Sequence, residues 1–122
     1  MKLEILEKII QESWNRDTCY PKLRNEWTPE NQARGQCAVT ALIVQDYVGG
    51  DLLYCRHNEH YWNRLPSGEE IDLTRRQFSQ ETTICLDETH ERDFVLNSEE
   101  AHITETSTRY QILKERVDKK LE

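Results

Sequence analysis

The stretch Arg34-Gly35-Gln36-Cys37-Ala38-Val39-Thr40-Ala41-Leu42 decides the fold, because it leads from a turn into an apolar run with helical spacing. The spacing continues beyond Leu42 and predicts a helix over residues 36–47. Gly49-Gly50 then ends the helix, since glycine readily takes the left-handed conformation found at helix C-termini. Cys37 therefore lies at the N-terminus of a helix whose alanine and leucine content suits a central, well-covered position.

The residues that follow predict a small antiparallel sheet, with strands over residues 51–56, 59–65 and 69–74. Pro66-Ser67-Gly68 between the last two strands is typical of a turn, because proline presets one φ angle and glycine accepts a positive one. Apolar residues at helical spacing also predict amphipathic helices near both ends of the sequence, over residues 2–14 and 107–120. The expected fold class is α+β, as a single domain over residues 1–122, with the cysteine-bearing helix packed on the sheet.

Three further segments carry less regular patterns. Residues 15–34 predict a long loop, held by packing of Trp14, Tyr20 and Trp27 over the first two helices. Thr74-Arg75-Arg76-Gln77 predicts a capping box that opens a short helix. Phe94-Val95-Leu96 predicts either a short strand or an apolar anchor within a loop.

Composition excludes several classes of function. The 16 Lys and Arg residues are outnumbered by 23 Asp and Glu, giving a net charge of -7. Without clustered cations, neither nucleic acid nor an anionic membrane surface is an expected partner. No apolar run approaches the roughly 20 residues of a membrane span, and the amphipathic start is unlike a signal peptide. We therefore expect a cytoplasmic protein with free thiols at its four cysteines.

The predicted turn places a histidine and an aspartate on one face of the hairpin. A three-residue loop pairs Leu65 with Glu69, which makes His60 and Asp72 diagonal neighbours. A helix N-terminus and a nearby histidine both favour the thiolate form of Cys37. These three residues are the candidate catalytic group: Cys37 as nucleophile, His60 as proton carrier and Asp72 as the group that orients the imidazole.

Other residues complete or compete with this group. The upstream amides of Gln36, Gln32 or Asn31 are candidates for binding an oxyanion, and Trp62 and Trp27 for lining a substrate cleft. Each catalytic candidate also has a structural alternative, because a lone cysteine is often a small buried hydrophobe and a strand histidine a satisfied core residue. No paired short cysteine or histidine spacing indicates zinc, so no metal and no cofactor are expected. His90 and His102 are expected to be solvated.

Several motifs together resemble the YunG family of small bacterial proteins. They begin with Thr18-Cys19-Tyr20-Pro21 and Trp27, and continue through the Cys37 stretch to Gln45-Asp46-Tyr47 and Gly49-Gly50. They end with His60-Tyr61-Trp62-Asn63, Ile71-Asp72-Leu73-Thr74, Gln77-Phe78 and Arg109-Tyr110. The resemblance covers most of the chain and implies a bacterial cytosolic protein, without indicating a substrate.

The order of Cys37, His60 and Asp72 also resembles the papain-like superfamily, which includes transglutaminase-like enzymes. There a cysteine opens a central helix and the histidine and its partner come from adjacent strands, which implies a papain-like core. This sequence departs in its short gap from Cys37 to His60 and in lacking a tryptophan after the cysteine motif. The expected function is hydrolysis or acyl transfer on a peptide or other acyl substrate; the alternative is a non-catalytic binding module on the same scaffold.

Overall fold

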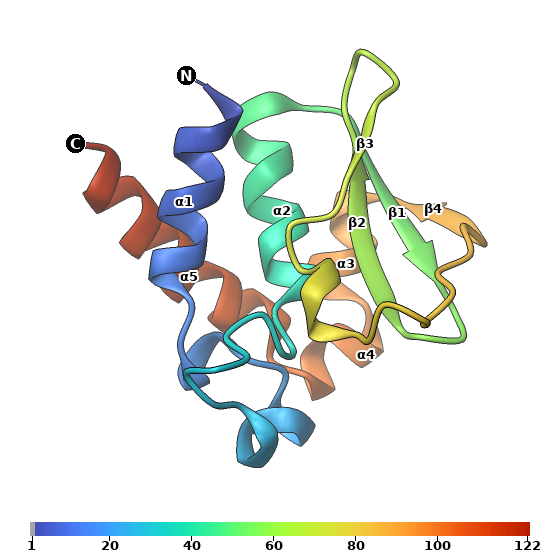
Figure 1. Cartoon of the computed structure of the whole chain (residues 1–122), viewed down its shortest axis with the longest axis horizontal. Helices are drawn as coiled ribbons and strands as arrows, with labels where there is room; N and C mark the ends of the chain where they lie inside the picture. Colours follow the sequence, from blue (N-terminus) through green and yellow to red (C-terminus); the bar gives the residue numbers. More distant parts are fainter. Residues whose placement is uncertain (1) are drawn as a thin grey trace.

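A small antiparallel sheet carries the helices on one of its faces (Figure 1). The computed structural model describes residues 2–122 and orders the strands β3-β2-β1-β4. The strands are β1 (Asp51–Cys55), β2 (His60–Arg64), β3 (Glu70–Ile71) and β4 (Glu88–His90). The α-helices are α1 (Leu3–Ser13), α2 (Cys37–Val48), α3 (Arg92–Asn97), α4 (Glu99–Ile103) and α5 (Thr106–Leu121), and the 3-10 helices are η1 (Arg16–Thr18), η2 (Pro21–Glu26) and η3 (Arg75–Gln77). The α+β class is therefore confirmed.

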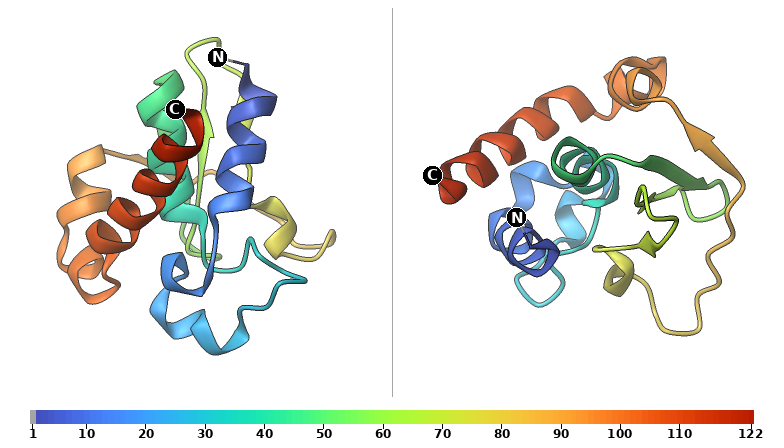
Figure 2. Two further views of the ribbon diagram at one scale, coloured as in Figure 1. Left: turned by 90° about the vertical axis from the view of Figure 1, so that its left-hand side faces the viewer. Right: turned by 90° about the horizontal axis from the view of Figure 1, so that it is seen from above.

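Helix α2 is central, as its composition predicts. It lies between the sheet on one side and α1 and α5 on the other (Figure 2). Six consecutive residues, Val39 to Val44, are buried, because a helix covered from both sides has no solvent-facing stripe. The Asn63 side chain of β2 donates a hydrogen bond to the Ala41 carbonyl at 3.0 Å, which joins the sheet to the helix. Cys37 is thus held at the end of a rigid element.

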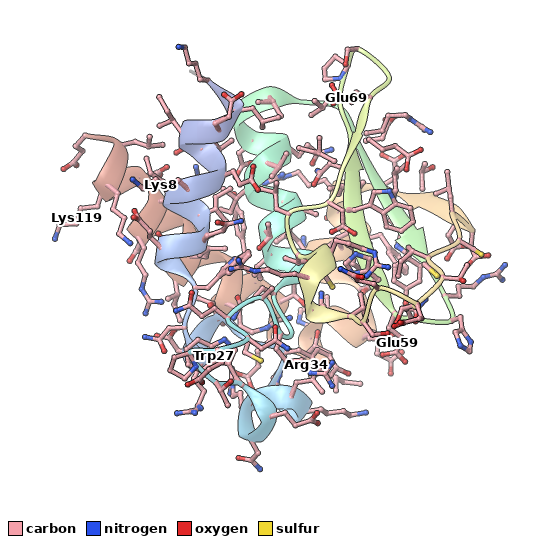
Figure 3. All side chains as sticks on the ribbon, in the orientation of Figure 1. Lys8, Trp27, Arg34, Glu59, Glu69 and Lys119 are labelled. Atoms are coloured by element: carbon pink, nitrogen blue, oxygen red, sulfur yellow. The ribbon has the colours of Figure 1, made fainter. Side chains whose placement is uncertain are left out.

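The predicted three-residue turn is confirmed by the strand register. Asn63 pairs with Ile71 and the Leu65 N–H donates to the Glu69 carbonyl at 2.8 Å. Figure 3 shows Glu69 and Glu59 at opposite ends of this hairpin. Strand β3 is nevertheless shorter than the predicted 69–74. The Asp72 carboxylate accepts a hydrogen bond from the Thr74 N–H at 3.2 Å, and this local turn replaces the strand ladder.

Side chains on the two faces of the sheet enter different clusters. Leu52, Tyr61 and Ile71 pack towards the helices and join the main core. Leu53, Cys55 and Trp62 form a second, smaller cluster on the other face with Ile84. Ile84 comes from the segment over residues 79–87, which crosses that face of the sheet before β4 (Figure 2).

Several local predictions need correction. Phe94-Val95-Leu96 is neither strand nor loop but lies in α3, because Val95 packs into the core while Phe94 stays exposed. Thr74 makes no capping hydrogen bond to the start of η3, so the capping box is wrong and only the short helix is confirmed. The predicted loop over residues 15–34 is tied down by η1 and η2. Over residues 2–122 the structure has no helix with the length and apolar character needed to span a membrane.

Candidate functional site

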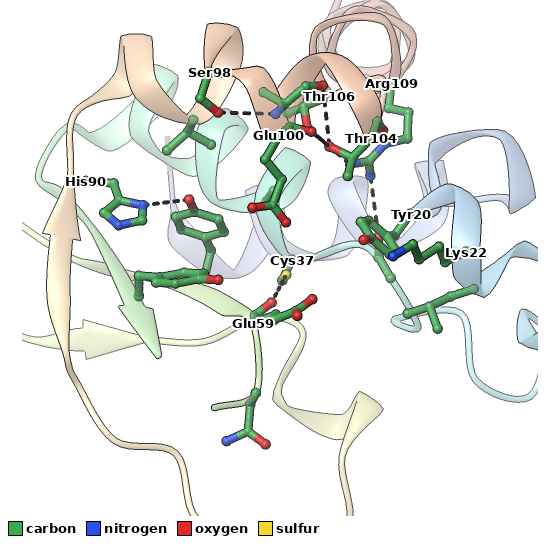
Figure 4. A pocket seen from close by; sticks show the side chains of 18 of the residues that line it. Tyr20, Lys22, Cys37, Glu59, His90, Ser98, Glu100, Thr104, Thr106 and Arg109 are labelled. Carbon is green, nitrogen blue, oxygen red and sulfur yellow. Dashed lines mark hydrogen bonds between the residues drawn. The ribbon is translucent and has the colours of Figure 1, made fainter. Parts of the chain in front are cut away.

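A cavity of about 600 Å³ opens at the N-terminus of α2. Its walls come from α2, the β1–β2 hairpin, η2, the α3–α4 region and the start of α5 (Figure 4). Cys37 and Glu59 lie close together there, with Glu100 above them and Tyr20 and Lys22 across the cavity (Figure 4). Elements from all parts of the sequence therefore meet at the cysteine.

Cys37 is the first residue of α2 and is partly exposed on this cavity. Its N–H belongs to the first helical turn, which lacks intrahelical acceptors and carries partial positive charge. The thiol donates a long hydrogen bond to the Glu59 carbonyl, with 3.8 Å between sulfur and oxygen. Glu59 itself has a left-handed φ of 48°, a conformation that non-glycine residues rarely adopt.

Gly35 explains the sharp approach of the chain to Cys37. Its φ of +73° is left-handed, and a Cβ atom at this position would lie 2.5 Å from the Cys19 sulfur. The Gly35 carbonyl also accepts the Tyr20 N–H at 2.9 Å. Only glycine fits a turn that is both left-handed and this closely packed.

His60 and Asp72 form the hydrogen-bonded pair that the sequence predicts. The His60 Nε2 and Asp72 Oδ2 atoms are 2.7 Å apart, and the imidazole is fully buried. The second carboxylate oxygen of Asp72 is held by the N–H and hydroxyl of Thr74. The rings of Trp62 and Phe78 pack on the imidazole and fix its orientation.

The thiol and the imidazole shift each other's pKa. Burial raises the pKa of Cys37, but the hydrogen bond and charge of His60, with smaller help from the Tyr61 N–H and Arg109, lower it below the ordinary value. Burial likewise lowers the pKa of His60, yet hydrogen bonds to Asp72 and Cys37 raise it to about 9. The His60 Nδ1 atom, the ring nitrogen that does not face Asp72, is buried without a hydrogen-bond partner in the described part of the chain. Both shifts favour a thiolate beside an imidazolium.

The predicted oxyanion-binding residues do not line the cavity. Gln36 is fully buried and its amide nitrogen donates to the Asn15 carbonyl at 3.0 Å. The Gln32 carbonyl accepts the indole N–H of Trp27. Gln77, which the sequence placed in a cap, lines the cavity instead. Its side-chain oxygen accepts the Gly35 N–H at 3.1 Å, and its amide nitrogen is buried without a partner.

The two predicted cleft tryptophans also lie outside the cavity lining. Trp27 is 6% exposed, and its indole N–H donates to the Gln32 carbonyl within the loop. Trp62 is equally buried, lies on the face of the sheet away from the helices and donates to the Glu70 carboxylate. Burial of Trp27 confirms that the loop is tied down. Aromatic walls are provided instead by Tyr20, Tyr54, Tyr61, Phe78 and Phe94.

The prediction that His90 is solvated is wrong. The Tyr61 hydroxyl lies 2.6 Å from its Nδ1 atom, and its Nε2 atom lies 2.8 Å from the Glu88 carboxylate. Burial, followed by the charges around it, raises the pKa of Tyr61, so this phenol stays protonated and donates to His90. The hydrogen-bonded series Tyr61–His90–Glu88 forms one wall of the cavity.

Arg109 closes the cavity from α5. Its guanidinium is buried and donates to the carbonyls of Thr104 at 2.9 Å and Thr18 at 3.1 Å. Burial lowers its pKa to about 10. The residue thus links α5 to the segment that precedes Cys37.

The remaining thiols differ from Cys37. Cys19 is buried, and burial raises its pKa to about 11; Cys55 is buried as well, and Cys85 is exposed. Within residues 2–122, none of the four cysteines forms a disulfide. The same residues contain no group of three or more His, Cys, Asp or Glu arranged to hold a metal ion.

Comparison with known proteins gives the family. The YunG protein family model matches residues 2–122. The chain belongs to the YunG family. It is 36% identical over 78 residues to the uncharacterized protein YunG of Bacillus subtilis (strain 168), an alignment that covers 62% of this chain and 63% of that protein. The chain thus matches less than two thirds of that relative's length. No solved structure matches, and the papain-like core stays a prediction.

Proposed function

We propose that this YunG-family protein is a cysteine-dependent hydrolase or acyltransferase that acts on an amide, isopeptide or thioester. The observation that carries the proposal is the hydrogen bond that the Asp72 carboxylate accepts from buried His60, the residue that lowers the pKa of Cys37. A thiol needs such a base and such an orienting carboxylate to become a nucleophile at neutral pH. The expected papain-like scaffold is part of the same proposal.

In the first half of the reaction, the Cys37 thiolate attacks the substrate carbonyl carbon and the π electrons move to the oxygen. The oxyanion accepts hydrogen bonds from the Gln77 amide and from the N–H at the start of α2. The intermediate then collapses, the bond from carbon to nitrogen or sulfur breaks, and the His60 imidazolium gives its proton to the leaving group. A thioester on Cys37 remains.

In the second half, water or an amine attacks the thioester. Neutral His60 takes the proton of the attacking group, and collapse of the second intermediate expels the Cys37 thiolate. Asp72 keeps the same imidazole tautomer throughout, because both of its oxygens are held. The product is an acid or a new amide, depending on the attacking group.

The alternative is a binding module, and one observation favours it. The Cys37 thiol already has a hydrogen-bond acceptor in the Glu59 carbonyl, as a neutral thiol would. In that case the cavity would hold a ligand without covalent chemistry.

Acylation of the thiols separates the two functions. The protein is treated with p-nitrophenyl acetate at neutral pH, and acetylated cysteines are located by peptide mass spectrometry. If the protein is an enzyme, Cys37 should be acetylated rapidly and acetate should then be released slowly. The His60→Ala variant should show neither step. Cys85→Ser is the matched control and should leave the reaction unchanged. Acetylation of Cys37 no faster than of exposed Cys85 would support the binding module instead.

A further inference from the structure

Two carboxylates converge on Cys37 from different elements. Glu59 lies in the turn between β1 and β2, and Glu100 lies in α4 and points towards the sulfur from the opposite side (Figure 4). Over residues 2–122 neither side chain takes part in an ion pair or hydrogen bond, whereas Glu88 is bound by His90. The negative charge beside the thiol is therefore free to meet a ligand.

The basic residues of the cavity do not neutralise these two carboxylates. The Arg109 guanidinium donates its hydrogen bonds to backbone carbonyls, and Arg34 pairs with Glu26 at 2.8 Å. Lys22 lies across the cavity on η2, beyond Tyr20 (Figure 4). Within residues 2–122, the two carboxylates beside Cys37 therefore have no cationic side chain paired with them, although the charge of Arg109 also acts on this part of the cavity.

The same part of the cavity is lined by aromatic rings. The ring centroids of Tyr54 on β1 and Tyr61 on β2 lie 4.6 Å apart, and both rings line the cavity together with Glu100. Burial and then the charges of Glu59 and Glu100 raise the pKa of Tyr54 to about 12, so it remains a neutral phenol. Neutral aromatic faces beside carboxylates form a favourable environment for an organic cation.

A second feature indicates what else the ligand carries. The Gln77 amide nitrogen is buried without a partner, and Gln77 is only 9% exposed. A buried donor of this kind is costly unless an acceptor arrives. Because Gln77 and Cys37 line one cavity, a ligand carbonyl is the group that would meet both.

We propose that the cavity recognises a cationic acyl compound, with its carbonyl at Cys37 and Gln77 and its ammonium or guanidinium group between Glu59 and Glu100. This substrate class rests on the proposed function for its carbonyl chemistry. The charge preference, in contrast, concerns the cavity alone. The two can therefore be tested separately.

Charged thiol reagents of similar size measure the preference. Cys37 is modified with 2-aminoethyl methanethiosulfonate, which is cationic, and with the anionic 2-sulfonatoethyl reagent, in the Cys85→Ser background. In each reaction the thiolate attacks sulfur, a mixed disulfide forms and methanesulfinate leaves. The ratio of the two second-order rate constants is compared with the ratio for 2-mercaptoethanol, which corrects for intrinsic reactivity.

We expect this corrected ratio to favour the cation by about tenfold or more, through local charge. Glu100→Gln and Glu59→Gln should each reduce it several-fold, while Glu115→Gln, an exposed change of equal charge on α5, should not. Glu100→Gln carries the test by itself if Glu59→Gln impairs folding. A corrected ratio near one, or in favour of the anion, overturns the charge preference even if Cys37 is highly reactive. A slow Cys37 with a strong cation preference would instead count against catalysis alone.

Discussion

At the scale of single residues, the proposed chemistry depends on one proton shared between Cys37 and His60. Asp72 is held on both oxygens, so it stabilises the imidazolium without needing to move. The imidazolium in turn stabilises the thiolate, and the two pKa values separate in opposite directions. The charged pair is thus favoured at neutral pH although its members lie in a partly buried site.

The first prediction concerns the pH dependence of Cys37 alkylation. With iodoacetamide, the midpoint of the rate profile should lie below the usual thiol value of about 8.5. His60→Ala removes the contributions that outweigh burial, so the midpoint should rise above that value. Asp72→Asn lowers the pKa of His60 from about 9 and should raise the midpoint less. Peptide mass spectrometry follows each thiol separately, with Cys85 as the internal reference; an unchanged profile in His60→Ala would show that the two groups are not coupled.

The sequence predicts the His60–Asp72 contact but not the role of Gln77. The contact follows from local rules, since a proline–glycine turn sets the register and the register sets the face. Gln77 reaches the site through a hydrogen bond to Gly35, 42 residues earlier. No periodicity or motif encodes a contact across that distance. The sequence therefore indicates only nearby amides as oxyanion-binding candidates, and Gln77 is not among them.

At the scale of elements, the start of α2 depends on how the preceding turn is packed. Gly35 binds Gln77 through its N–H and Tyr20 through its carbonyl, so one residue connects the oxyanion candidate to the loop. The N–H groups at the start of α2 can meet a ligand only if this turn directs them into the cavity.

The second prediction tests that turn. Gly35→Ala places a methyl group against the Cys19 sulfur and the Tyr20 backbone, in addition to a strained left-handed φ. Gly68→Ala has a similar φ of +93° but open space around it, and is the matched control. Strain alone costs about 1–2 kcal/mol, so Gly68→Ala should lose that amount and Gly35→Ala clearly more. Urea denaturation measures both; equal losses would mean that the packing around Gly35 yields without cost.

Element prediction succeeds for long segments and fails for short ones. Helices α1, α2 and α5 are long enough for helical spacing to be visible, and their bounds agree with the predicted ones to within about two residues. Helices α3 and α4 and strand β4 are too short to repeat a pattern. They form because residues 88–104 pack against α5 and β1, which only the tertiary structure reveals.

At the scale of the whole molecule, α5 contributes the last wall of a cavity whose other walls come from earlier parts of the chain. Arg109 reaches from α5 to Thr18 and lies near the Gly35 carbonyl. Its charge also contributes to the lowered pKa of Cys37. The sequence shows an amphipathic helix here, but gives no sign that an arginine on its buried side supports the cysteine turn.

The third prediction compares two arginines of α5. Arg109→Ala leaves the Thr18 and Thr104 carbonyls buried and unpaired, and should lower the free energy of unfolding by about 2–4 kcal/mol. Arg116→Ala removes a partly exposed ion pair with Asp17 and should cost under about 1 kcal/mol. Thermal and urea denaturation give both values. Equal losses would mean that the buried guanidinium stabilises the fold no more than a surface one.

The left-handed backbone at Glu59 favours other residues than glutamate. Glycine or asparagine would adopt its φ of 48° with less strain, and either would remove the carboxylate beside Cys37. A chain selected only for resistance to unfolding would therefore carry a different residue at this position. Under the proposed cation-binding role, glutamate at this position gives up a small margin of stability and supplies the carboxylate beside Cys37.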